Sequence, residues 1–250
     1  MNFVLVHGAW HGAWCWRKVV PELQRLGDTV ATPDLPGLGD DPTPAGGVTL
    51  ADYAQRIAAV LDAREEPSIL VGHSMGGMAI SAAAELRPAK IRRLIYLCAF
   101  LPRNGESLLQ LEERNADPRV PPHITPDKDN FTGTIDGDAV VELFYHDCSA
   151  EDVAFAKSRL RPQSFLPLKA PVTLTDRNFG RVPRSYIECT EDRAIVIGFQ
   201  RLMQQHSPCE SVVSLDTSHS PFFSAPALLA RTLSEFAAQP ASRPGRRRMS

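Results

Sequence analysis

One segment restricts the fold of this chain more than any other: Gly72-His73-Ser74-Met75-Gly76-Gly77. The apolar run Ser68–Val71 precedes it and an alanine-rich stretch follows it, so a buried strand is expected to turn directly into a helix. Such a turn strains its apex residue and needs neighbours without bulk, which Gly72 and Gly76 provide. The pattern G-x-S-x-G is common by chance. The strand–turn–helix context is what predicts Ser74 as a nucleophile.

The rest of the chain repeats the alternation of strand and helix. Five more short runs rich in valine and isoleucine are expected to be buried parallel strands, namely Phe3–Val6, Thr29–Thr32, Leu94–Cys98, Arg184–Glu188 and Glu210–Ser214. Segments with helical spacing lie between most of the runs, namely Ala51–Ala63, Met75–Leu86, Arg193–Gln205 and Leu228–Ala237. The alternation predicts an α/β fold with a mostly parallel sheet of about six strands and helices on both faces.

One region interrupts this alternation. We assign residues 1–101 and 184–238 to the core and residues 102–183 to an insertion, in which the strand pattern is lost. Helical spacing at Ala139–Tyr145 and Ala150–Ser158 favours a helical cap, because a structureless loop of this length is uncommon. Residues 239–250 carry four arginines and no acidic residue, and are expected to form a disordered basic tail.

Composition narrows the partners and the location. The formal net charge of -2 gives no reason to expect nucleic acid or an anionic membrane as partner. No run approaches the roughly 18 apolar residues that span a bilayer, and the first residues lack the basic region of a signal peptide. The 5 cysteines are widely spaced, which argues against a disulfide framework and a metal site. We expect a cytoplasmic protein without metal or cofactor.

A serine hydroxyl needs a base to remove its proton. Among 7 histidines, His219 is the best candidate, because it lies in a loop between the last strand and the last helix. Loops at the carboxyl ends of parallel strands are where α/β sheets place their sites. His73 is adjacent to Ser74 in sequence, but a neighbour on a sharp turn points elsewhere. His219 is therefore predicted to be the base.

The acid that orients the base is expected after the penultimate strand, which gives the chain order serine, acid, histidine. Asp192 lies a few residues past that strand and is predicted to be the acid. It also stands where a helix is expected to begin, so a helix N-cap is the structural alternative. Glu188 and Glu191 are local rivals.

Two backbone N–H groups are expected to hold the oxyanion, that of Met75 after the nucleophile and that of Ala9 in the loop after the first strand. Candidate pocket residues are apolar and lie in the first loop, in the cap or beside the triad, namely Trp10, Phe100, Leu101, Phe144, Phe165 and Phe222. Such a pocket suits small hydrophobic or aromatic esters. No lysine or arginine stands out as a carboxylate clamp, although Arg159, Arg161 and Arg177 stay open.

These features together resemble a known family. The segment Val6–Trp16, the turn Asp34-Leu35-Pro36-Gly37, the Ser74 turn and the loops of Asp192 and His219 are similar to those of small serine esterases of the α/β-hydrolase superfamily. The similarity is to the branch that holds plant methylesterases, salicylate-binding esterases, hydroxynitrile lyases and bacterial aryl- and pyrethroid-type esterases. It covers residues 2–98 and 184–237. The resemblance implies a carboxylesterase that forms an acyl-enzyme from a small-molecule ester, as a monomer or homodimer.

Other activities use the same machinery. The hydroxynitrile lyases of this branch carry threonine where Gly8 stands and lysine directly after the triad histidine, where this chain has Ser220. Both differences favour hydrolysis over cyanohydrin cleavage. Hydrolysis of a carbamate, amide or lactone stays open, and so does a ligand-binding protein built on a hydrolase fold.

Overall fold

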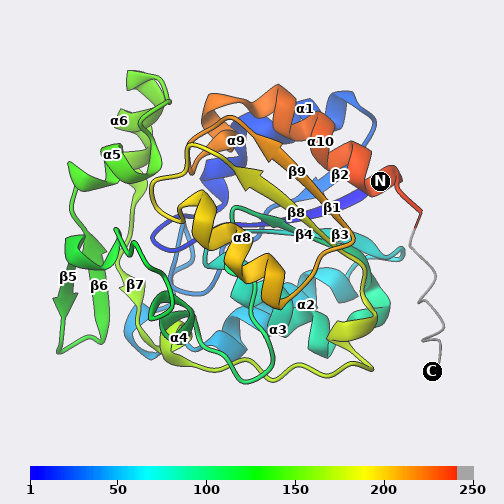
Figure 1. Ribbon diagram of the computed structural model, residues 1–250, viewed down its shortest axis with the longest axis horizontal. Helices are drawn as coiled ribbons and strands as arrows, with labels where there is room; N and C mark the ends of the chain where they lie inside the picture. The colour runs from blue at the N-terminus through cyan, green and yellow to red at the C-terminus, as the bar shows by residue number, and fades with distance from the viewer. Residues whose placement is uncertain (241–250) are drawn as a thin grey trace.

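A single parallel sheet lies at the centre of the computed structural model, which describes residues 1–240 (Figure 1). Its strand order is β2-β1-β3-β4-β8-β9, and every pairing in it is parallel. The strands are β1 (Asn2–Val6), β2 (Thr29–Ala31), β3 (Ser68–His73), β4 (Ile91–Leu97), β8 (Arg184–Cys189) and β9 (Ser211–Leu215). The expected α/β-hydrolase fold with six strands is confirmed. The predicted disordered tail lies outside the described residues from residue 241 onward.

Helices cover both faces of the sheet, which is why its central strands are apolar throughout. Figure 1 shows α1 (Val19–Arg25) and α10 (Pro226–Ala238) together on one face, and α2 (Leu50–Asp62) and α3 (Gly76–Leu86) on the other. Two further helices follow the last two strands, namely α8 (Ile197–His206) and α9 (Pro221–Ser224). None of the helices within residues 1–240 has the length and apolar composition to span a bilayer.

Local sequence signals explain where these helices begin. Helix α2 starts with a capping box, in which Thr49 and Asp52 satisfy each other's backbone N–H groups. Helix α8 begins at Ile197, four residues later than its spacing predicted. The intervening residues form a turn instead, because the N–H groups of Ala194 and Ile195 donate to the Asp192 carboxylate at 2.7 and 2.9 Å.

Most of residues 102–183 project beyond one end of the sheet, whereas the segment from Thr175 onward returns beside α3, where Glu85 accepts the N–H groups of Thr175 and Phe179 (Figure 1). The two expected helices are present there as α5 (Ala139–Phe144) and α6 (Ala150–Arg159), with shorter helices α4 (Leu108–Glu112) and α7 (Leu166–Lys169). A small antiparallel sheet of order β5-β6-β7, which was not expected, lies between them. Its strands are β5 (Ile124–Asp127), β6 (Thr132–Ile135) and β7 (Gln163–Ser164). They are too short, and β5 too exposed, for a period of two to stand out.

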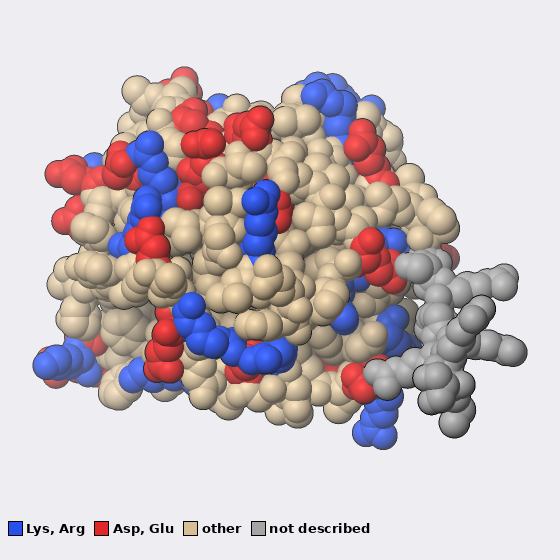
Figure 2. Space-filling view, in the orientation of Figure 1, with Lys and Arg blue, Asp and Glu red and all other residues tan. Residues whose placement is uncertain are grey.

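Charged side chains of both signs are mixed over the face shown in Figure 2. No broad field of one sign covers that face, which fits the formal net charge of -2. A strongly basic surface, as nucleic-acid binding requires, is therefore not a feature of this side of the molecule.

Candidate active site

The turn from β3 into α3 places Ser74 at its apex in a strained conformation. The φ of Ser74 is 55°, in the left-handed region that non-glycine residues rarely adopt. The surrounding glycines make room for this turn. A Cβ atom at Gly76 would lie 2.8 Å from the carbonyl oxygen of His7, and one at Gly8 would lie 2.8 Å from the Ser74 Cβ. The first loop can therefore pass directly beside the serine only because it carries glycine there.

His219 and Asp192 form a buried pair. The Nδ1 atom of His219 donates to Asp192 Oδ2 at 2.7 Å, and both side chains are almost fully buried. The other carboxylate oxygen of Asp192 accepts the two backbone N–H groups at the start of its turn. Because Nδ1 carries the proton in this arrangement, Nε2 of neutral His219 is left as an acceptor. This tautomer is the one that general-base chemistry requires.

The rival acids point elsewhere. Glu188 is bound by Arg201 at 3.2 Å and accepts further hydrogen bonds from Gln204 and Ser214. Glu191 is exposed at the surface. Only the Asp192 carboxylate reaches the His219 ring among the three candidates. Asp192 also accepts two N–H groups of its own turn, but it is not a helix N-cap, because α8 begins at Ile197 with Val196 as its N-cap.

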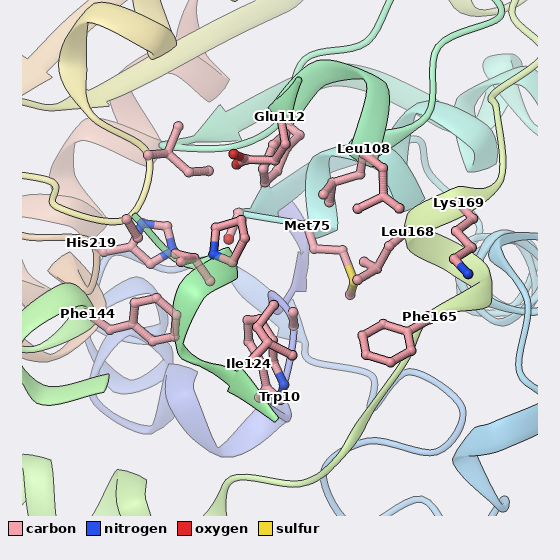
Figure 3. A pocket seen from close by; sticks show the side chains of 18 residues that line it. Trp10, Met75, Leu108, Glu112, Ile124, Phe144, Phe165, Leu168, Lys169 and His219 are labelled. Atoms are coloured by element: carbon pink, nitrogen blue, oxygen red, sulfur yellow. The ribbon is translucent and has the colours of Figure 1, made fainter. Parts of the chain in front are cut away.

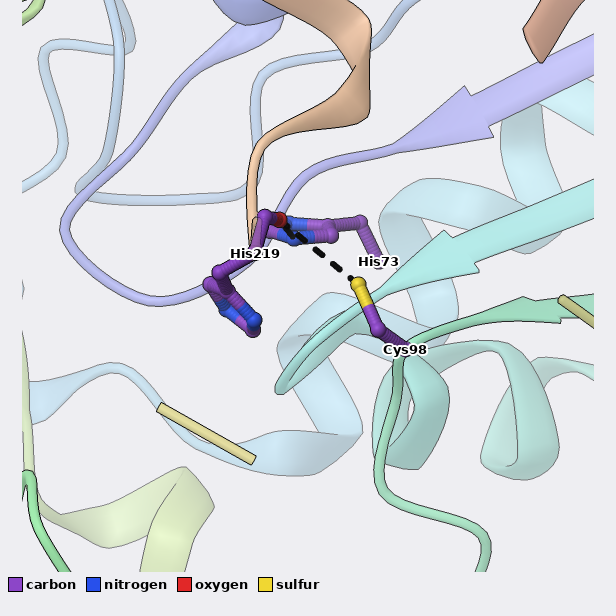
Figure 4. Close-up of side chains that lie close together, drawn as sticks. All are labelled: His73, Cys98 and His219. Carbon is purple, nitrogen blue, oxygen red and sulfur yellow. Dashed lines mark hydrogen bonds between the residues drawn. The ribbon is translucent and has the colours of Figure 1, made fainter. Parts of the chain in front are cut away.

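The loop that carries His219 is held from below by the core. His73 Nε2 donates to the carbonyl oxygen of His219 at 2.8 Å, and the two rings lie 4.5 Å apart. The Cys98 thiol approaches the same carbonyl at 3.6 Å, as Figure 4 shows. Burial, together with the neighbouring His219, lowers the pKa of His73 well below its usual value. His73 therefore stays neutral and acts as a hydrogen-bond donor to the loop.

His73, Cys98 and His219 also bring their potential ligand atoms within 4.8 Å of one another. One ring nitrogen of each histidine is already engaged: His73 Nε2 donates to the His219 carbonyl, and His219 Nδ1 donates to Asp192. Burial raises the pKa of the Cys98 thiol well above its usual value, which disfavours the thiolate that binds metals. The cluster therefore fits a loop anchor better than a metal site.

The cap side of the site fixes the same loop from above. Asp147 accepts the backbone N–H of Ser218 at 2.8 Å, and the Ser218 hydroxyl donates to the carbonyl of Phe144 at 3.2 Å. The Phe144 ring lies 5.2 Å from the His219 ring. His219 is therefore positioned from both the core and the cap.

Ser74 and His219 open into one cavity of about 310 Å³ (Figure 3). Of the predicted pocket residues, Trp10, Phe100, Phe144 and Phe165 line this cavity. The remaining lining is mainly aliphatic and comes largely from the cap, with Leu108, Leu109, Val120, Pro121, Ile124, Leu168, Ala194 and Ile195. These residues carried no signal in the sequence, because only the fold of the cap turns them inward.

Two predicted pocket residues lie outside the lining. Leu101 is buried next to Met203, whose sulfur accepts its backbone N–H at 3.4 Å. Phe222 is fully buried and packs edge-on against His73 at 5.0 Å and against Trp16 at 5.4 Å. Neither side chain lines the cavity, because closeness in sequence to the strand end or to His219 does not decide which way a side chain points.

Two backbone N–H groups of residues that line this space have no acceptor within residues 1–240. They are the N–H groups of Ala9 and Met75, and both residues line the cavity beside Ser74. Free donors next to a nucleophile are the arrangement that stabilises an oxyanion. Within the described residues, Ser74 Oγ and the His219 ring form no hydrogen bond with each other. Such contacts are often long in free enzymes and shorten when substrate binds.

The chain is similar to known proteins in both sequence and structure. Residues 3–232 match the model of the alpha/beta hydrolase family. The chain is 37% identical over 214 residues to salicylic acid-binding protein 2 of Nicotiana tabacum, covering 80% of this chain and 82% of that protein. The chain belongs to the alpha/beta hydrolase family.

The chain is also similar to proteins that are named methylesterase, pyrethroid hydrolase and esterase. It is 37% identical over 248 residues to putative methylesterase 11, chloroplastic, of Arabidopsis thaliana, covering 94% of this chain but 64% of that protein. The structure is similar to that of a pyrethroid hydrolase from Sphingobium faniae JZ-2, with a TM-score of 0.88, 32% identity and coverage of 97% and 99%. Polyneuridine aldehyde esterase is similar with a TM-score of 0.84 and 28% identity, covering 94% of this chain and 98% of that one.

Proposed function

We propose that the protein is a serine esterase that hydrolyses small hydrophobic or aromatic carboxylic esters. The observation that carries the proposal is the buried pair of His219 and Asp192, joined at 2.7 Å, opening with the strained Ser74 into a single apolar cavity. The similarity to proteins named methylesterase, esterase and hydrolase supports the same reaction class.

The proposed mechanism has two acyl-transfer steps. Ser74 attacks the ester carbonyl while His219 Nε2 takes its proton, and the N–H groups of Ala9 and Met75 hold the oxyanion. Asp192 fixes the tautomer of His219 and stabilises its cation. His219 then protonates the leaving alcohol, and water repeats the sequence on the acyl-enzyme. No metal or organic cofactor takes part in this scheme.

The size and lining of the cavity support the substrate class. A volume of about 310 Å³ is at the small end of ligand pockets. Its aromatic and aliphatic lining favours an apolar acyl or alcohol group. Arg161, which was open as a carboxylate clamp, is instead bound to the carbonyl oxygens of Gly39 and Asp41 at 2.9 and 2.8 Å. Neither Arg159 nor Arg177 lines the cavity.

The first test is steady-state hydrolysis of p-nitrophenyl acetate, butyrate and octanoate by the wild type and by Ser74→Ala. Loss of a triad member typically lowers kcat by several orders of magnitude, so we expect less than about 1% of wild-type activity to remain. Labelling by an organophosphate should give one modified site per chain. Residual activity above about 1% with an intact fold would remove Ser74 from the proposal.

The other outcomes distinguish the alternatives. Release of a carbonyl compound and cyanide from a cyanohydrin, without ester turnover, would favour a lyase. Turnover of p-nitrophenyl carbamates or anilides in preference to esters would favour carbamate or amide hydrolysis. Tight retention of a ligand without turnover or labelling would favour the binding protein.

We also propose a cytoplasmic location and a monomer or homodimer that binds no nucleic acid and no membrane. All of its cysteines, the last of which is Cys209, are free, which suits a reducing compartment. Cell fractionation tests the location, and size-exclusion chromatography with light scattering tests the assembly. Recovery in a membrane fraction or as a larger oligomer would contradict the respective statement.

A further inference from the structure

One acidic side chain lines the mainly apolar cavity. Glu112, the last residue of α4, is the only carboxylic acid among the lining residues, which are mostly aliphatic and aromatic. Figure 3 shows its carboxyl group on the side of the cavity toward His219, whereas Lys169 lies beyond Met75 on the opposite side. A carboxyl group in such surroundings is costly unless it has hydrogen-bond partners.

The protein supplies only part of those partners. Glu112 Oε2 accepts a hydrogen bond from Asn115 Nδ2 at 3.2 Å. The structure gives Oε1 no donor from any residue between 1 and 240. Burial raises the pKa of Glu112, and the hydrogen bond from Asn115 opposes that shift only in part. The carboxyl group is thus held in place through Oε2, and Oε1 can accept a further hydrogen bond.

The other charged residue in the lining does not neutralise Glu112. Within the described residues the two side chains form no ion pair, and Lys169 Nζ lies 5.4 Å from the centre of the Phe131 ring instead. Glu112 therefore meets the interior of the cavity without a fixed counter-charge. Its unused acceptor is available to whatever occupies the cavity.

We propose that Glu112 is a specificity-determining residue that accepts a hydrogen bond from a hydroxyl group on the substrate. This inference rests on the proposed esterase function and names its substrate class more closely: a neutral aromatic or aliphatic ester that carries a hydroxyl group away from the scissile bond. The substrate hydroxyl donates to Glu112 Oε1, which receives no hydrogen bond from the described residues. An ester with a carboxylate at that position is rejected, because two acids would meet in an apolar space.

The test compares methyl phenylacetate with the methyl esters of 2-, 3- and 4-hydroxyphenylacetic acid. We expect kcat/KM of the wild type for at least one hydroxy ester to exceed that for methyl phenylacetate by about tenfold, the value of one hydrogen bond to the half-buried carboxyl group of Glu112. In Glu112→Leu this ratio falls to about one. Glu112→Gln keeps an acceptor oxygen and retains most of the preference.

Glu113→Gln is the matched control. Glu113 is the next residue, is exposed and does not line the cavity. It should leave both the hydroxyl preference and the rate unchanged. Circular dichroism of each variant separates loss of preference from loss of fold.

A second measurement needs no catalysis. The Kd of Ser74→Ala for 2-, 3- and 4-hydroxyphenylacetamide and for phenylacetamide is measured by calorimetry, with and without Glu112→Leu. About tenfold tighter binding of one hydroxy amide, lost with Glu112→Leu, supports the inference even if no ester is turned over. Ester turnover that depends on Ser74 but shows no hydroxyl preference overturns it and leaves the esterase proposal standing.

One further probe separates hydrogen bonding from ion pairing. The methyl ester of 4-(aminomethyl)phenylacetic acid carries a cation where the hydroxy ester carries a neutral donor. Faster hydrolysis of this cationic ester than of every hydroxy ester would overturn the assignment of a neutral substrate. Slower hydrolysis agrees with it.

Discussion

The two walls of the cavity are built differently. The core wall carries Ser74, Asp192 and His219 at the ends of β3, β8 and β9, and the His219–Asp192 pair is fixed by hydrogen bonds from the loops around it. The cap wall presents mainly apolar side chains from short helices and strands, with Glu112 as its one acid. Under the proposed function, the core sets the chemistry, whose geometry tolerates little displacement, and the cap sets which substrate fits.

The cap is fastened to the core by polar contacts as well as by apolar packing. Asp152, buried at the start of α6, accepts from Arg17 at 2.8 Å and from Lys18 at 2.6 Å. In addition, Trp10 Nε1 donates to the carbonyl of Gly133 at 2.9 Å. Since Arg17, Lys18 and Asp152 do not line the cavity, this contact can be disturbed separately from the core wall by mutation.

The largest effect is expected from Asp192→Asn, which disturbs the core wall alone. An amide at this position offers an N–H where His219 Nδ1 needs an acceptor, so the ring is held in the wrong tautomer. In serine proteases the corresponding change lowers kcat about 10⁴-fold, and we expect a similar loss here. Steady-state kinetics on p-nitrophenyl butyrate measure it.

Glu188→Gln is the control for this prediction, because Glu188 lies on β8 but is bound by Arg201 rather than by His219. It should lower kcat less than about threefold, because Glu188 is buried on β8 but makes no hydrogen bond to His219 or Asp192. A larger loss of kcat from Glu188→Gln than from Asp192→Asn would mean that Asp192 is not the acid that orients His219.

A smaller effect is expected from Asp152→Ala, which loosens the cap wall alone. It removes a buried acceptor shared by Arg17 and Lys18, both of which are partly exposed and can return to water. We expect a loss of about 2 kcal/mol in the free energy of unfolding, with KM raised more than kcat is lowered. Urea unfolding and steady-state kinetics measure the two quantities.

Glu151→Ala is the matched control, because Glu151 is the neighbouring residue on α6 but is exposed. It should change neither stability nor KM. If Asp152→Ala lowered kcat as strongly as Asp192→Asn, the two walls could not be disturbed independently, and this part of the comparison would be wrong.

The core wall could be predicted from sequence, and the cap wall could not. Buried parallel strands leave continuous apolar runs, and the turn at Ser74 needs glycine at fixed positions, so both are visible in the residues. The cap strands are two to four residues long, too short for a period of two to stand out. Side-chain direction escaped prediction on the core side as well, because that of Phe222 depends on contacts that no local pattern encodes. From the sequence alone, Glu112 is expected to be an ordinary surface acid, and only the fold places it in the lining of the cavity.

The last prediction concerns a buried contact that joins the two walls. His11 of the core loop donates through Nδ1 to the carbonyl of Ala9 at 2.7 Å, so its Nε2 accepts the hydroxyl of Tyr145, which follows α5, at 2.5 Å. Burial lowers the pKa of His11 from 6.5 to about 3. The folded protein keeps His11 neutral over a pH range in which the unfolded chain protonates it.

Stability from this residue is therefore complete above pH 6.5 and is lost as the pH falls from there toward 3. Each pH unit in this window costs about 1.4 kcal/mol, or about 2 kcal/mol between pH 6.5 and pH 5. The double variant His11→Phe/Tyr145→Phe removes the titrating ring together with its partner, so its unfolding free energy should fall by about 2 kcal/mol less over this interval.

Tyr145→Phe alone keeps the buried imidazole and should keep the full pH dependence, although it lowers stability at every pH. Urea unfolding of the three proteins at pH 7 and pH 5 makes the comparison. An equal pH dependence in the wild type and the double variant would mean that His11 takes up no proton on unfolding. The contact between core and cap would then be insensitive to acid, and loss of stability at low pH would have to come from other groups.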